Sequence, residues 1–244
     1  MLHVKIEKAS IWLGLGMTVA FGVMFWLIAG VIPPLNPNDT AEQTARIYTD
    51  RHLRMQIGFA LMIFFAFLYA PFFAVLSRQV RRIEGYWGSM SVTQILLSVT
   101  FPFLFSLCSI FAAVAAYRPE RNPDVTQALN DIFWFLFVGV VGPLITQVII
   151  VALATFIDKR AVPTFPRWFG YFNIWYAVLG VPGCAIYLFK TGPLAWNGIF
   201  AFWIPLPVFF TWIVVTGVML LKAIDIEAAE REKAAAERMW EPAA

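Results

Sequence analysis

The sequence predicts an all-α membrane protein, a bundle of six transmembrane helices built as three hairpins with both termini in the cytoplasm. Three observations lead to this prediction. Only 14% of the 244 residues are charged and 60% are hydrophobic, whereas a soluble domain has about 25% charged residues. The apolar residues form six long runs, without the periods of 3.6 or 2 that mark elements buried on one face. The loops between the runs differ in basic residues from one side to the other.

Each apolar run reaches, or nearly reaches, the roughly 20 residues that a spanning helix needs. The runs are residues 11–32, 57–76, 92–116, 132–157, 168–189 and 196–221. The first run follows Lys5 and Lys8, but it exceeds the roughly 7–15 apolar residues of a signal peptide, and no A-x-A site follows. We therefore expect an uncleaved first helix, a transmembrane domain over residues 1–224, and a cytoplasmic C-terminal helix and tail over residues 225–244.

The orientation follows from lysine and arginine, which are enriched in cytoplasmic loops. The two chain ends and the second and fourth loops hold twelve of these residues, and the remaining loops hold six. Tryptophans near the run ends support the same register, among them Trp12 and Trp168 on the inner side and Trp134 and Trp196 on the outer side. The sequence thus predicts a multi-pass protein of the bacterial inner membrane.

Two outer loops carry helix-start signals. In the first, Asp39 and Glu42 have the spacing of a capping box, which predicts a short amphipathic helix leading into the second span. In the second, Asn122 precedes Pro123, and proline is favoured at the first position of a helix. We expect this second helix to continue into the fourth span.

Every run after the first contains a proline in its interior. These prolines are Pro71, Pro102, Pro143, Pro182, Pro205 and Pro207. A proline removes one backbone donor and frees a carbonyl one turn earlier, and in hydrocarbon that carbonyl must face protein or a water-lined cavity. The pattern indicates either a central cavity lined by broken helices or kinked helices with close packing of small residues. We expect Pro143 to bend the fourth span and to leave the Gly139 carbonyl without its usual partner.

Ionisable residues are scarce inside the runs and gather at the outer mouth. Asp131 enters the fourth span where water thins, so an ion pair or a shared water between Asp131 and Arg54 or Lys190 is expected there. Gln147 lies one turn beyond Pro143 and could bond another helix or a ligand. The candidate ligand-binding residues are Arg54, Asp131, Trp134, Gln147, Lys190, Trp196 and Asn197.

The composition argues against several kinds of site. There are two histidines, His3 and His52, whereas membrane di-iron enzymes need clusters of them. Cys108 and Cys184 have no second cysteine at metal-ligand spacing. No nucleotide, zinc or nucleophile motif occurs, and no basic stripe suggests nucleic acid. We assign no catalytic residue, metal or cofactor, and expect no nucleic-acid partner.

Three segments resemble a known group of proteins. They are Ala128-Leu129-Asn130-Asp131, the stretch from Phe165 to Tyr171, and the stretch from Lys190 to Gly198. All three are similar to segments of small uncharacterised polytopic membrane proteins of bacteria, such as the mycolic-acid actinobacteria and their relatives. The resemblance implies a bacterial inner membrane and no particular activity.

Three functions remain open on these grounds. The first is a membrane protein that binds or passes a small lipophilic or neutral solute, which an apolar cavity at mid-membrane would favour. The second is a cofactor-free enzyme, an isomerase or cyclase, at the outer vestibule, which convergence of His52, Asp131 and Lys190 would favour. The third is a structural subunit of a larger complex. The expected partners are membrane lipid, a lipophilic small molecule, and a second copy or another membrane protein.

Overall fold

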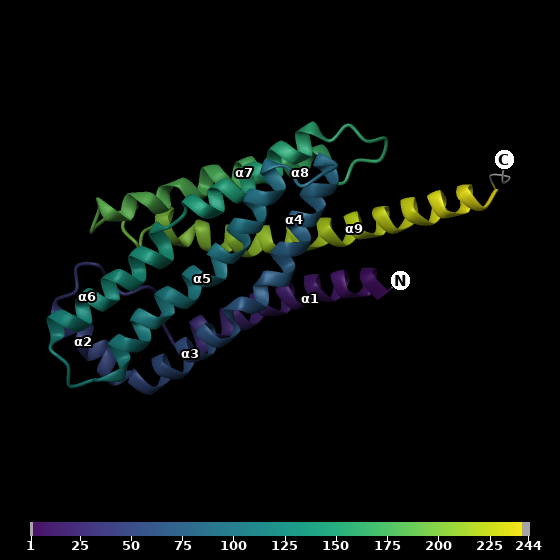
Figure 1. Cartoon of the computed structure of the whole chain (residues 1–244). Helices are drawn as coiled ribbons and strands as arrows, with labels where there is room; N and C mark the ends of the chain where they lie inside the picture. The colour runs from purple at the N-terminus through teal and green to yellow at the C-terminus, as the bar shows by residue number, and fades with distance from the viewer. Residues whose placement is uncertain (1, 241–244) are drawn as a thin grey trace.

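A computed structural model describes residues 2–240 of the chain, and within them every regular element is a helix. Six helical segments are long and apolar enough to cross a membrane: Leu2–Ile28, His52–Glu84, Ser89–Tyr117, Pro123–Ile157, Arg167–Tyr187 and Ile199–Arg238. They form one elongated bundle (Figure 1). The predicted all-helical fold with six candidate spans is confirmed for the described residues.

The spans are built from shorter helical pieces. The first consists of α1 (Leu2–Gly22) and the π-helix η1 (Val23–Ile28). The second consists of α3 (His52–Phe65), the 3₁₀ turn η2 (Ala66–Tyr69) and α4 (Ala70–Glu84). The third is α5 (Ser89–Tyr117). The fourth consists of α6 (Pro123–Trp134), the π-helix η3 (Phe135–Gly139) and α7 (Gly142–Ile157).

The last two spans are also composite, and one helix lies outside the spans. The fifth span consists of α8 (Arg167–Gly180) and the 3₁₀ segment η4 (Val181–Tyr187). The sixth consists of the π-helix η5 (Ile199–Trp203) and α9 (Pro205–Trp240). Helix α2 (Ala41–Asp50) precedes the second span.

Prolines interrupt the second, fourth, fifth and sixth spans, while α5 continues through Pro102. In the fourth span the helix stops at Val140, so the predicted bend at Pro143 is confirmed. Because Pro143 has no N–H, the Gly139 carbonyl loses its usual donor. It accepts instead from the Val141 N–H at 2.9 Å, so the freed carbonyl is paired locally.

The predicted helix starts in the outer loops are partly confirmed. Asn122 caps α6 by accepting from the Asp124 N–H at 2.9 Å. The capping box of α2, however, is formed by Thr40 and Gln43, and the prediction of Asp39 and Glu42 was wrong by one residue. The reason is local, since the Asp39 N–H bonds the Asn36 carbonyl in the preceding turn and Thr40 is then the first residue free to cap.

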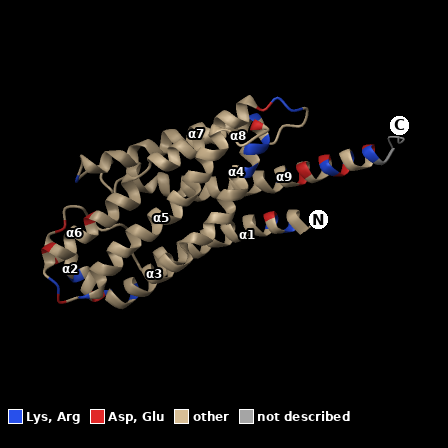
Figure 2. Ribbon diagram, viewed as in Figure 1, with Lys and Arg blue, Asp and Glu red and all other residues tan. Residues whose placement is uncertain are grey.

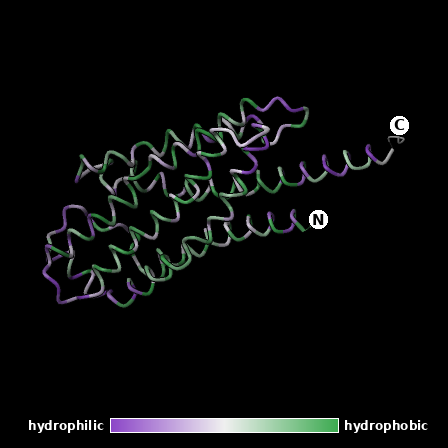
Figure 3. Tube along the Cα trace, in the orientation of Figure 1, coloured by the Kyte–Doolittle hydropathy of each residue, from purple (hydrophilic) through white to green (hydrophobic). Residues whose placement is uncertain are grey.

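Charged residues gather at the two ends of the bundle and leave its middle apolar (Figures 2 and 3). Both ends of the described chain lie together, with the α4–α5 and α7–α8 loops (Figure 1). We call this the terminal end, and the opposite end, which holds α2 and the α5–α6 loop, the distal end. Helix α9 extends beyond the rest of the bundle at the terminal end, where residues 231–238 are exposed.

Candidate functional site

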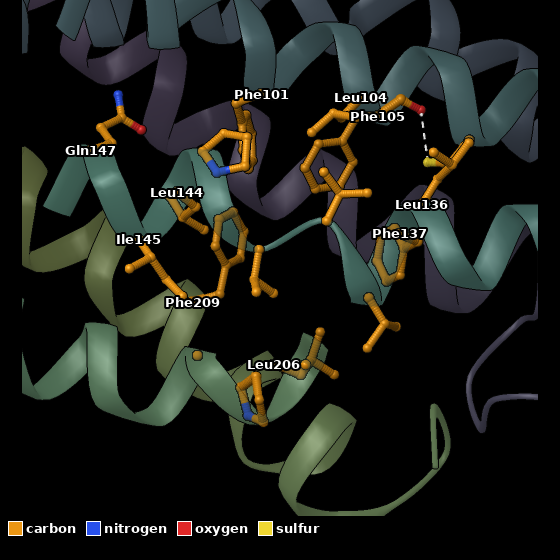
Figure 4. Close-up of a pocket in the computed structure, with 18 of the residues that line it drawn as sticks. Phe101, Leu104, Phe105, Leu136, Phe137, Leu144, Ile145, Gln147, Leu206 and Phe209 are labelled. Atoms are coloured by element: carbon orange, nitrogen blue, oxygen red, sulfur yellow. Dashed lines mark hydrogen bonds between the residues drawn. The ribbon is translucent and has the colours of Figure 1, made fainter. Parts of the chain in front are cut away.

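A partly open cavity of about 140 Å³ lies between α5 and the breaks in the fourth, fifth and sixth spans (Figure 4). Its volume is close to that of an engineered cavity of about 150 Å³ that stays dry and binds benzene. Gln147, which lines it, is ten residues from the last residue of α7, Ile157. Ten residues correspond to about 15 Å of helix, half of the roughly 30 Å hydrocarbon core. The cavity is therefore at mid-membrane depth.

The helix breaks create this space. Pro143, in the first turn of α7, and Pro205, which begins α9, line the cavity together with Gly180, the last residue of α8, and Gly183 of η4. A Cβ added to Gly180 would meet nothing closer than an Ile145 atom at 3.9 Å, so the wall is open there. At Gly183, by contrast, an added Cβ would lie 2.8 Å from the Val138 carbonyl oxygen. Gly183 thus allows two broken helices to approach closely, and Gly180 leaves room beside them.

Phenylalanine rings form much of the wall. Phe101 and Phe105, one turn apart on α5, have ring centroids 4.4 Å apart, and Phe105 lies 5.6 Å from Phe137. Phe209 of α9 stacks on Phe101 at 5.4 Å, and Phe21 of α1 meets Phe105 edge-on at 4.7 Å. Because these rings pack against one another, they form a continuous apolar wall.

Three side chains with polar atoms line the cavity: Cys108, Gln147 and Tyr176. The Cys108 thiol bonds the Phe105 carbonyl at 3.3 Å. Gln147 is only 1% exposed, and its Nε2 has no hydrogen-bond partner among the described residues. Gln147 lies at one end of the cavity, and Leu136 and Phe137 lie at the other (Figure 4). The cavity is therefore apolar with one polar end, nearer the terminal end of the bundle.

Three of the candidate residues, Trp134, Trp196 and Asn197, lie at the distal end, where the two tryptophans form a buried aromatic contact. The Trp134 and Trp196 rings stack with centroids 6.4 Å apart. Trp196 Nε1 donates to the Leu35 carbonyl at 2.7 Å, and the Asn197 carbonyl accepts from Trp203. Trp134 and Trp196 are 0% and 4% exposed, so both rings are buried inside the protein. The hydrogen bond from Trp196 holds the loop that contains Leu35.

Arg54 does not pair with Asp131, and that part of the expected ion pair was wrong. Arg54 donates to the Leu27 and Ile28 carbonyls, at 2.8 and 3.3 Å. Asp131 accepts from the neighbouring Asn130 amide at 3.4 Å. Lys190 is close enough to act on Asp131 electrostatically, but within the described residues the two form no ion pair.

Within the described residues, no hydrogen bond joins the side chains of His52, Asp131 and Lys190. His52 is exposed, and its Nδ1 lies 2.9 Å from the Thr49 carbonyl oxygen. The Lys190 backbone carbonyl accepts from Asn38. Of the seven candidate residues, Gln147 alone lines the cavity. Among residues 2–240, moreover, no group of three or more His, Cys, Asp or Glu side chains is placed to hold a metal ion.

Sequence reasoning missed the aromatic wall and Tyr176. The signal was present in part, because Phe101 and Phe105 flank Pro102 at helical spacing. It could not be used, since 24 phenylalanines occur in the chain and most apolar residues of a spanning helix face lipid or other helices. Helix packing alone showed which rings meet.

No protein-family model, no curated protein and no solved structure matches this chain.

Proposed function

We propose that this protein binds or passes a small, uncharged, lipophilic solute in the mid-membrane cavity. We place it in the bacterial inner membrane, with both termini cytoplasmic and the six spans arranged as three hairpins. The observation that carries the proposal is the cavity itself, which lies where helix breaks in three spans face α5. Broken helices are the means by which many transporters make a binding site at the bilayer midplane.

The chemistry of the wall supports the choice of ligand. The lining side chains carry no formal charge, and an ion held at this depth would be costly without a partner. Phenylalanine rings offer large, flat apolar surfaces that pack well on an aromatic or branched solute. A neutral molecule of modest size is therefore the class of solute that this space fits.

Filling the cavity tests the proposal. Gly180→Leu places a branched side chain at the open part of the wall, where an added Cβ meets only Ile145 at 3.9 Å. Gly16→Leu is the matched control, since Gly16 is exposed on α1 and an added Cβ meets nothing within 4 Å. Each variant is purified in lipid nanodiscs, and the uptake of α-methylstyrene, a small aromatic hydrocarbon, is measured by equilibrium dialysis against empty nanodiscs.

We expect saturable uptake above the lipid background for the wild type and for Gly16→Leu, and loss of this excess in Gly180→Leu. Extraction and mass spectrometry of the same samples should show a copurified neutral molecule that Gly180→Leu lacks. Uptake equal to that of empty nanodiscs for the wild type would contradict the proposal.

A second candidate, a subunit that packs against a partner, is favoured by one observation. Residues 231–238 of α9 are exposed and extend past the bundle (Figure 1). Truncation after Glu230 removes this extension and keeps the Glu230–Arg82 ion pair. If the extension serves a partner, the truncated protein should lose its oligomer or its copurifying protein in light scattering and retain the uptake of α-methylstyrene.

A further inference from the structure

The cavity is lined by a buried amide that the protein leaves without a hydrogen-bond partner. Gln147 lines the cavity, is 1% exposed, and has no partner for Nε2 among the described residues. Buried polar groups in proteins are almost always hydrogen-bonded, and an exception calls for an explanation. Other buried groups of the described residues, such as Gln94, are also unpaired, but Gln147 is the one among them that lines the cavity, so a bound molecule can supply its missing partner.

The other polar side chains do not supply that partner. Cys108 is engaged with the Phe105 carbonyl, and Tyr176, on α8, lines the cavity without a hydrogen bond to Gln147 in the described structure. The Gln147 amide oxygen points towards the lining rings and its nitrogen points away from them (Figure 4), but the terminal torsion of a glutamine is broad, so rotation of the amide turns its NH₂ group towards the cavity. Gln147 is therefore available to donate to a bound molecule.

The membrane setting makes this hydrogen bond the main source of selectivity. A hydrocarbon that leaves lipid for the cavity gains from packing on the aromatic wall, but it gains little from the hydrophobic effect, because lipid tails are as apolar as the wall. A carbonyl or hydroxyl oxygen in lipid has no donor, and it gains one in the cavity. A net hydrogen bond of ordinary strength corresponds to a roughly tenfold preference.

We infer that the cavity selects a neutral lipophilic ligand that carries a carbonyl or hydroxyl oxygen, with Gln147 Nε2 as its hydrogen-bond donor. The inference rests on the proposed function of the cavity. The oxygen lies at the Gln147 end, and the apolar body of the ligand extends along Phe101 and Phe105 towards Phe137 at the other end (Figure 4).

Two probes of nearly identical shape test the inference. Acetophenone carries a ketone oxygen where α-methylstyrene carries a methylene group. The uptake of each probe is corrected with empty nanodiscs, and the ratio of the two corrected uptakes measures how much the hydrogen bond to Gln147 strengthens binding. The wild type should prefer acetophenone by roughly tenfold over α-methylstyrene. Gln147→Leu should abolish this preference and retain the binding of α-methylstyrene.

Gln94→Leu is the matched control. Gln94 is a second buried glutamine, 0% exposed and with both amide atoms unpaired, but it does not line the cavity. Its replacement should leave the preference unchanged. If Gln147→Leu fails to fold, infrared spectra of the wild type still decide, because the carbonyl band of bound acetophenone should lie at lower frequency than in empty nanodiscs.

The outcomes separate the inference from the proposed function. If neither probe binds the wild type above the lipid background, the cavity is not a binding site and both fail. If both probes bind equally, or if Gln147→Leu keeps the preference for acetophenone, the role of Gln147 is overturned and the proposed function stands. An unshifted carbonyl band would overturn the role of Gln147 in the same way.

Discussion

At the start of α3, two arginines reach across to the backbone of the first span. Arg54 donates to the Leu27 and Ile28 carbonyls, and Arg51 donates to the Gly30 carbonyl at 3.0 Å. The last carbonyls of a helix have no partner within it, and a cation is also favourable at the negative end of the helix dipole. The expected role of Arg54 as a partner of Asp131 was wrong because these carbonyls already take its donors.

Arg54→Gln should therefore destabilise the protein. The shorter side chain loses both carbonyl contacts, and we expect a loss of about 1–3 kcal/mol in unfolding free energy. Thermal unfolding in detergent measures this. Arg118→Gln serves as control, since Arg118 is exposed in the loop after α5 and its replacement should change the midpoint little. Equal midpoints for the two variants would refute the capping role.

Asp158 orders the loop after α7 in a similar way. Its carboxylate accepts from the Arg160 guanidinium at 2.9 and 3.0 Å and from the Thr164 N–H at 2.8 Å. Burial raises the pKa of Asp158, but the hydrogen bonds from Arg160 and Thr164 outweigh it and bring the pKa below its ordinary value. The ionised form is therefore bound more tightly in the folded state.

This lowered pKa makes stability depend on pH in a defined window. The contribution of Asp158 is complete above its unfolded pKa of about 3.9 and is lost as the pH falls through the lower folded pKa. Asp158→Asn should lower the unfolding midpoint at pH 7, and the gap to the wild type should narrow as the pH drops below about 4. Midpoints measured from pH 7 to pH 3 check this, and a gap that stays constant would disprove it.

Among the elements, the contact of α3 with the end of the first span depends on a glycine. A Cβ on Gly58 would lie 2.6 Å from the Ala29 Cβ and 2.8 Å from the Ala29 backbone nitrogen. Such small-residue contacts let helix backbones approach closely in membranes. Both readings of the proline and glycine pattern thus apply to this molecule, close packing at Gly58 and Gly183 and a cavity at Gly180.

Gly58→Ala should cost about 1–3 kcal/mol, because the backbone at Ala29 has to move. Gly16→Ala, on the open face of α1, should be neutral or stabilise by up to about 1 kcal/mol through helix propensity. Unfolding midpoints of the two variants in detergent give the comparison. A Gly58→Ala protein as stable as Gly16→Ala would show that the contact is loose.

For the whole molecule, ion pairs at the terminal end join helices that are far apart in the sequence. Arg78 of α4 contacts Glu7 of α1 at 2.6 Å and Glu227 of α9 at 2.8 Å. Lys8 pairs with Asp225 at 2.5 Å. The base of α9 is thereby tied to α1 and α4, and its exposed extension begins beyond this cluster.

The predicted orientation can be tested by cysteine labelling. In a background with Cys108→Ala and Cys184→Ala, single cysteines at Arg46 and Glu120, both exposed at the distal end, should react with an impermeant thiol reagent added to intact cells. Cysteines at Lys159 and Ala234, exposed at the terminal end, should react only after lysis. This follows from the twelve basic residues on one side against six on the other, and the reverse pattern would overturn it.

The sequence by itself determined the helical class, the six candidate spans and the proline breaks in the second, fourth, fifth and sixth spans, whereas α5 continues through Pro102. These properties depend on local chemistry. A run of about 20 apolar residues has to satisfy its backbone within a helix, and a proline such as Pro143 removes a donor wherever it stands. The Asn122 cap was predictable for the same reason, and the Thr40 cap was missed by one residue because the preceding turn set its start.

Tertiary structure alone decided which breaks meet and what lies between them. Pro143, Gly180 and Pro205 are widely separated in the chain, yet all line one cavity. The partners of Arg54 and the unpaired state of Gln147 likewise depend on neighbouring helices. Apolar runs carry no pattern that distinguishes a lipid-facing side chain from one facing another helix, because lipid and protein interior are equally apolar. The helix packing supplies that distinction, and with it the site.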